Sequence, residues 1–154
     1  AWLMQAVDQI KSGNTKAALS SLDKAKLWPE NLGAGKPYDD NIDLRLENYL
    51  EGLALEKGKQ KKKAHEKFAA IGNAEHAGRR HQITDLITAL ALKKLNRADE
   101  GEKLLQAWLE DQPKNETAQW AYAVYNGKSP TVEIEGNDSY RIIKKMVDEV
   151  GVAN

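Results

Sequence analysis

The chain has 154 residues, about the length of one ordinary domain, and its 23 lysines and arginines balance 23 aspartates and glutamates. Because the net charge is zero, no overall field attracts nucleic acid or an anionic membrane, so neither is an expected partner. The absence of cysteine excludes disulfide frameworks, thiolate catalysis and cysteine-based zinc sites. The longest apolar stretch, at 86–92, is far shorter than the ~20 residues that span a bilayer.

Alanine, leucine, lysine and glutamate are abundant, and glycine and proline fall between segments, which together favour an all-α fold. The first helical hairpin is expected at residues 1–27. Gly13 and Asn14 end its first helix, and Thr15 is the expected N-cap of a second helix that runs to about Lys26. Apolar residues recur in the first helix at steps of three and four, at Trp2, Leu3, Ala6, Val7 and Ile10.

A long connection that contains several glycines and prolines follows, from Pro29 to Asp40. Asp39 or Asp40 is the expected N-cap of the next helix. The second hairpin is expected at residues 41–71, with a break between its two helices at Gly58.

The third hairpin is expected at residues 80–112, with its turn at Asn96 and Arg97 and its end before Pro113. Two capping helices are expected after it, at about 115–127 and 138–150. The segment 131–135 between them fits a short strand. Apolar side chains mark the two helices of the third hairpin, at Ile83, Leu86, Ile87, Leu90 and Leu95 and at Leu104, Leu105, Trp108 and Leu109.

Small residues form a repeated pattern in the three hairpins. Each hairpin carries a pair of them twelve positions apart, one in each helix, and a large apolar residue follows four positions after the second member. Small side chains allow two helices to approach closely, so these positions predict where the paired helices cross. The pairs are Ala6 and Ala18, Gly52 and Ala64, and Ala89 and Gly101; the large residues are Leu22, Phe68 and Leu105.

This pattern resembles the tetratricopeptide repeat, which carries a small residue in each helix and closes with a proline. Trp2, Ala25, Pro29 and Pro113 occupy further positions that match the repeat. The resemblance implies an α-α superhelix of about three degenerate hairpins followed by capping helices.

Two segments, Trp28 to Tyr38 and Leu109 to Tyr125, are similar to the C-terminal repeat region of large Bacteroidetes proteins of unknown function. In those proteins a mutarotase-like β-sandwich precedes the repeats. The resemblance implies that the chain is a fragment, the tail of such a protein, and it implies a carbohydrate-related process.

No constellation of residues points to a particular chemistry. Gly33 to Lys36 lacks the earlier glycine and the final serine or threonine of a phosphate-binding loop, so we interpret it as part of a shaped connector. His65, His76 and His81 lack the spacing of a helical metal site and are expected at the surface. Neither a metal nor another cofactor is therefore expected, and the residues assigned to the structural loop are Trp28, Pro29, Gly33, Gly35 and Tyr38.

Two surfaces remain as candidates for a partner. The concentrated positive charge at residues 57–67 could grip phosphates, but a solubilising turn is the preferred interpretation because stacking aromatics are absent there. In a tetratricopeptide stack, the first helices of hairpins two and three would line a concave groove, where an extended peptide or a neighbouring domain could bury apolar surface. The alternative is that these side chains are core residues; they are Leu46, Tyr49, Leu53, Ile83, Leu86 and Leu90.

The sequence therefore predicts a non-catalytic helical-repeat module for protein-protein or interdomain interaction, in the cytoplasm. Its expected partner is another protein or an N-terminal domain of the same protein, and a truncated fragment is expected to form a homodimer. The alternative function is an accessory C-terminal region of a carbohydrate-active enzyme that contributes to its site or assembly. An acidic or aromatic-lined pocket around Trp28, Tyr38 and Trp120 would favour this alternative.

Overall fold

The computed structural model describes residues 2–27, 44–73, 81–128, 130, 134 and 138–151. Within these ranges every regular element is an α helix, which confirms the predicted all-α class. The connection at 28–43, with its predicted structural loop and aspartate cap, lies outside the described residues, as does all of the expected strand except Ile134. The helices are α1 (Trp2–Lys11), α2 (Thr15–Leu27), α3 (Arg45–Lys57), α4 (Lys61–Gly72), α5 (Thr84–Lys94), α6 (Ala98–Asp111), α7 (Glu116–Tyr125) and α8 (Asp138–Glu149).

The turn between α1 and α2 has a different cap from the predicted one. Gly13 adopts a positive φ of 82°, and the side chain of Asn14 accepts a hydrogen bond from the Ala17 amide at 3.2 Å. Asn14 therefore acts as the cap that the sequence assigned to Thr15. Thr15 instead donates its hydroxyl to the Ala54 carbonyl at 3.1 Å, which links the start of α2 to α3.

Gly58 ends α3 as predicted, but this position does not require glycine for a positive φ. Its φ is −81°, and the left-handed residue of this turn is Lys59, with φ 63°. A Cβ at Gly58 would lie 2.9 Å from Thr15 Cγ2. The glycine therefore provides the space in which the first two hairpins approach each other.

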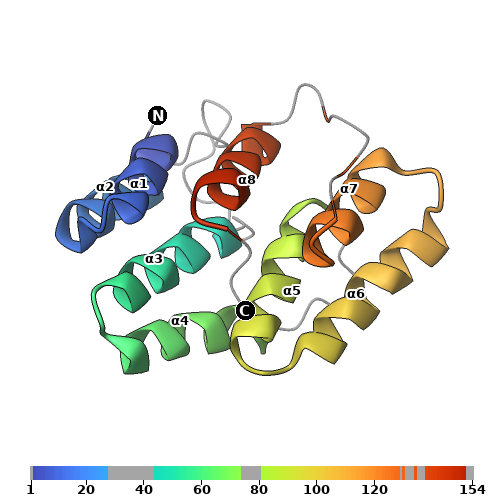
Figure 1. Cartoon of the computed structure of the whole chain (residues 1–154), viewed down its shortest axis with the longest axis horizontal. Helices are drawn as coiled ribbons and strands as arrows, with labels where there is room; N and C mark the ends of the chain where they lie inside the picture. The colour runs from blue at the N-terminus through green and yellow to red at the C-terminus, as the bar shows by residue number, and fades with distance from the viewer. Residues whose placement is uncertain are drawn as a thin grey trace.

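The helices stack in chain order. From α1 to α7 each helix contacts the next, and α1, α3, α5 and α7 also contact one another in sequence. Figure 1 shows the three hairpins side by side, with α8 returning across them to α1. We call α1, α3, α5 and α7 the inner row. Because each hairpin buries an apolar face against its neighbour, one core runs through the described helices.

The six small residues lie buried between helices, as their spacing predicts. A Cβ at Gly101 would lie 2.8 Å from the Ala89 carbonyl oxygen, so this pair marks the crossing of α5 and α6. A Cβ at Gly52 would lie 2.5 Å from the Phe68 ring, between α3 and α4. The prediction that small residues mark helix crossings is thus confirmed for these two hairpins, and Leu22, Phe68 and Leu105 are buried as well.

The last helix, α8, covers part of the inner row. Ile143 and Met146 are buried, and the rings of Tyr140 and Trp120 meet edge to face with their centroids 4.9 Å apart. At the other end of the row, the Lys145 ammonium lies 2.9 Å from the Asp8 carboxylate. In this way α8 connects the first and last helices of the inner row (Figure 1).

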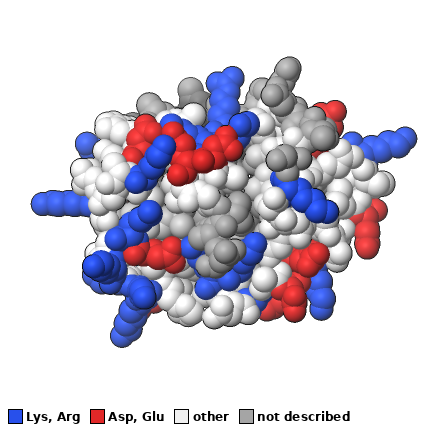
Figure 2. All heavy atoms as spheres, viewed as in Figure 1, with Lys and Arg blue, Asp and Glu red and all other residues white. Residues whose placement is uncertain are grey.

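The surface mixes charges of both signs. Figure 2 shows lysines and arginines gathered at the lower left edge, where the turn between α3 and α4 lies in Figure 1. Among the described helices, none combines the length and hydropathy needed to cross a bilayer.

Candidate functional site

The six side chains predicted to line a partner groove are core residues in the structure. None of them is more than 5% exposed, and all belong to the continuous core. They therefore offer a partner no exposed apolar stripe. Leu46 and Ile83 still reach the wall of a cavity that opens beside the inner row.

This cavity has a volume of about 270 Å³ and mixed polar and apolar walls. Its lining comes from α3, α6, α7, α8 and from the residues at the start of α5. Volumes of about 300–1,000 Å³ are usual for pockets that enclose a drug-sized ligand, so this one is suited to a side chain or two. Its lining residues are Leu46, Glu47, His81, Gln82, Ile83, Thr84, Trp108, Asn115, Thr117 and Ser139.

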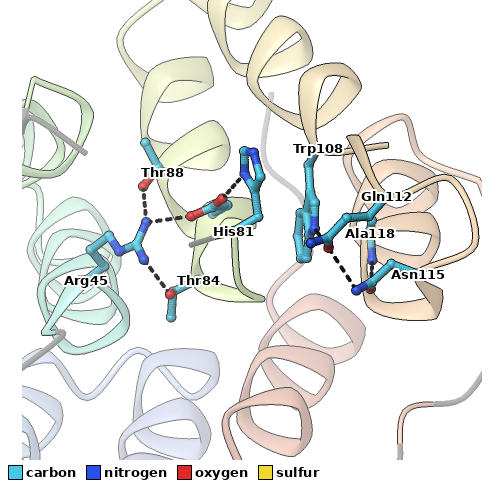
Figure 3. A network of polar contacts seen from close by, with 9 residues as sticks. Arg45, His81, Thr84, Thr88, Trp108, Gln112, Asn115 and Ala118 are labelled. Atoms are coloured by element: carbon cyan, nitrogen blue, oxygen red, sulfur yellow. Dashed lines mark hydrogen bonds and ion pairs between the residues drawn. The ribbon is translucent and has the colours of Figure 1, made fainter. Parts of the chain in front are cut away.

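A buried polar network joins the two inner helices beside the cavity (Figure 3). Arg45 Nη1 lies 3.0 Å from Asp85 Oδ1 and donates to the Thr88 hydroxyl at 3.0 Å, while Nη2 donates to the Thr84 hydroxyl at 2.6 Å. Arg45 and Asp85 are each 7% exposed. Because buried charges require partners, this network fixes α3 against α5 in one register.

His81 extends the network to the cavity mouth. Its Nδ1 lies 2.9 Å from Asp85 Oδ2, and its ring stacks on Trp108 with the centroids 5.8 Å apart (Figure 3). The expectation of a surface histidine is therefore wrong for His81, which is held between a carboxylate and an indole. His65 is exposed as expected, and His76 lies outside the described residues.

The opposite wall is also held by hydrogen bonds (Figure 3). Trp108 Nε1 donates to Gln112 Oε1 at 2.9 Å, and Asn115 Nδ2 donates to the same oxygen at 3.0 Å. The side-chain Oδ1 of Asn115 accepts a hydrogen bond from the Ala118 amide at 3.0 Å and so caps α7. The cavity walls are therefore fixed before any ligand arrives, which favours binding because less conformational entropy is lost.

One signal for this network is present in the sequence, although helical periodicity alone does not reveal it. Asp85 is a charged residue inside an otherwise apolar run, and Thr84 and Thr88 lie on its side of the helix. A buried carboxylate predicts a cationic partner, but forty positions separate Asp85 from Arg45, so the pair could not be assigned from the sequence. In the described residues, no cluster of histidine, aspartate and glutamate has the arrangement of a metal site.

Of the three aromatic residues whose pocket would favour the carbohydrate-related alternative, the structure describes Trp120. Trp120 is buried against Tyr140 and is 2% exposed, so its face is not open to a sugar. Trp28 and Tyr38 lie outside the described residues.

A second cavity, of about 330 Å³, lies near Tyr125, where the end of α5, the start of α6 and the end of α7 meet. The Tyr125 hydroxyl donates to the Ala98 carbonyl at 2.6 Å, and the Lys93 ammonium lies 4.8 Å from the ring centroid. Burial, followed by the charges of Glu102 and Asp99, raises the pKa of Tyr125 to about 12.

This raised pKa predicts a loss of stability in alkali. The neutral phenol is favoured in the folded state, so its stabilisation is complete below the unfolded pKa of about 10 and is lost as the pH rises through about 12. In Tyr125→Phe, the free energy of unfolding should depend less on pH between those values than in the native chain. Denaturant titrations across this interval measure the difference, and parallel curves for the two proteins would contradict the prediction.

No protein-family model matches the chain, and no curated protein or solved structure is significantly similar to it. The resemblances to tetratricopeptide repeats and to Bacteroidetes proteins therefore stay predictions. The functional proposal depends on the geometry of the site alone.

Proposed function

We propose that the chain is a non-catalytic helical-repeat module, tetratricopeptide-like in its stacking, that holds a segment of a protein partner or of another domain. The stacking order supports the repeat interpretation, because α1, α3 and α5 each contact both their own hairpin partner and the next inner helix. Modules built in this way use the inner row of helices to bind extended chains.

The observation that carries the proposal is the polar cavity at the inner row. Glu47, His81 and Thr117 contribute a carboxylate, an imidazole and a hydroxyl group to its lining, and Leu46 and Trp108 contribute apolar surface. An extended peptide offers both hydrogen-bonding amides and an apolar side chain, and such a mixed lining suits both. The binding segment is proposed to insert one or two side chains here.

A selection of random linear peptides on the immobilised chain tests the proposal. Thr117→Trp places an indole in the cavity, so the selected peptides should lose at least about tenfold in affinity. Ser20→Trp adds the same side chain to the exposed surface of α2 and should leave the affinity unchanged. Isothermal titration calorimetry on each variant measures these affinities.

The proposal fails if the selected peptides bind Thr117→Trp as tightly as the native chain. It also fails if repeated selection gives no peptide that binds. Thermal melting of both variants shows whether a lost affinity reflects a filled cavity or a lost fold.

A further inference from the structure

Tertiary structure gathers lysines from two hairpins at one edge of the molecule. Thr15, at the start of α2, contacts the end of α3 through the Ala54 carbonyl and the space left by Gly58. The next residue, Lys16, therefore joins the lysine run of the second hairpin. We call this surface the lysine edge; it comprises Lys16, Lys57, Lys59, Lys61, Lys62 and Lys63, all exposed.

The lysines of this edge form no ion pairs that would stabilise the described part of the fold. None of the six forms an ion pair with a carboxylate in the part of the chain that the structure describes. Glu56, beside Lys57, is already held by Lys94 at 2.8 Å. By contrast, Lys67, one turn further along α4, lies 3.6 Å from the buried Glu51. Within the lysine run of the second hairpin, the charge without an ion pair in the described residues therefore lies on the lysine edge.

Three of these lysines occupy an unfavourable place. Lys61, Lys62 and Lys63 form the first turn of α4, which contains no acidic residue, and the side chain of Gln60 makes no capping hydrogen bond. Cations are destabilising near the positive end of a helix. A polyanion bound across the edge would remove this repulsion, whereas the folded chain alone does not.

We propose that the lysine edge binds the phosphate backbone of duplex nucleic acid without reading its sequence. Duplex DNA carries about one negative charge per 1.7 Å of axis, so several lysines can engage it together. The exposed residues that separate the lysines of 57–63 along the chain are Gly58 and Gln60, which neither stack on single-stranded bases nor insert into a bilayer. The sequence favours a solubilising turn here because stacking aromatics are absent, but a duplex presents its phosphates without any stacking of its bases on the protein.

Two double variants separate the edge from the overall charge. Lys62→Glu with Lys63→Glu reverses two charges on the edge, and Lys103→Glu with Lys114→Glu reverses two exposed lysines on or next to α6. Acidic residues suit the first turn of α4, so the edge variant should melt at the same temperature as the native chain or higher. A lost affinity then cannot be ascribed to unfolding.

Fluorescence anisotropy with a labelled mixed-sequence duplex of about 20 base pairs measures the affinity over a range of salt concentrations. With about four phosphate contacts, the native affinity should fall by about 100-fold between about 50 and 200 mM salt. The edge variant should bind at least about tenfold more weakly than the control variant, and the magnitude of its salt slope should be smaller by about 2.

Equal weakening of both variants would overturn the proposal, because it would show that net charge alone matters. Binding that does not respond to salt would overturn it too. Titrations with phosphatidylserine vesicles and with polyglutamate run in parallel, and tighter binding to either than to the duplex would also overturn it.

Discussion

Replacement of Gly101 by alanine is expected to lower the free energy of unfolding by about 2 kcal/mol. A Cβ at this position would lie 2.8 Å from the Ala89 carbonyl oxygen, 3.1 Å from the Ala89 Cα and 2.6 Å from the Tyr125 hydroxyl oxygen. Two of these atoms belong to the backbone of α5, so α5 and α6 would have to separate. At an exposed helical site, replacement of glycine by alanine would raise the free energy of unfolding by about 1 kcal/mol. The sign of the measured change therefore tests whether α5 and α6 approach closely at Gly101.

Gly72→Ala is the matched control. A Cβ there would meet Leu95 Cδ1 at 3.0 Å and Leu92 Cδ2 at 3.1 Å, and both atoms are the ends of flexible side chains. The change in unfolding free energy should stay within about 0.5 kcal/mol. Urea unfolding at constant pH measures both variants. If Gly101→Ala proved more stable than the native chain, the two helices would not be in close contact at this point.

Removal of the Asp85 carboxylate is expected to have the largest effect, a loss of about 3–5 kcal/mol in Asp85→Ala. The Arg45 guanidinium would remain buried between α3 and α5 with its charge uncompensated. His81 would lose the carboxylate that holds its imidazole at the cavity mouth. The variant should therefore also bind the selected peptides more weakly, even where it is still folded.

An exposed ion pair provides the comparison. Lys144 and Asp148 lie 2.7 Å apart on α8 with their side chains 47% and 58% exposed, so Asp148→Ala should cost no more than about 0.5 kcal/mol. Arg45→Met combined with Asp85→Ala removes both buried charges and should recover part of the loss. Similar costs for Asp85→Ala and Asp148→Ala would show that the inner network does not fix the register of the helices.

Local patterns in the sequence were sufficient to predict where the described helices lie. Apolar residues at steps of three and four, with turns at Gly13, Gly58 and Asn96, placed the helices to within a few residues. The residues that cap the helices at the turns could be predicted less well from the sequence. Asn14 and Thr15 are both favourable N-cap residues, so the sequence does not distinguish them. In the structure Asn14 caps α2, because the Thr15 hydroxyl donates its hydrogen bond to the Ala54 carbonyl of α3.

The candidate site depended on contacts that no local pattern contains. The apolar side chains predicted to line the groove on α3 and α5 are expected to be buried, but the sequence does not say whether a partner or the chain's own core buries them. In the structure these side chains belong to the core, because neighbouring helices of the same chain bury them. The cavity itself lies where residues from five segments converge, so its lining could not be assembled from the sequence.

By itself, the sequence determined the all-α class, the three hairpins and the small residues at which their helices approach. Helical periodicity and side-chain volume are local properties, and they report directly on local structure. Tertiary structure alone decided that Arg45 meets Asp85, that Thr15 at the start of α2 meets the end of α3, and that the apolar stripe of the inner helices is covered. Those outcomes depend on distances between segments far apart in the chain, and these distances are set only when the whole core packs.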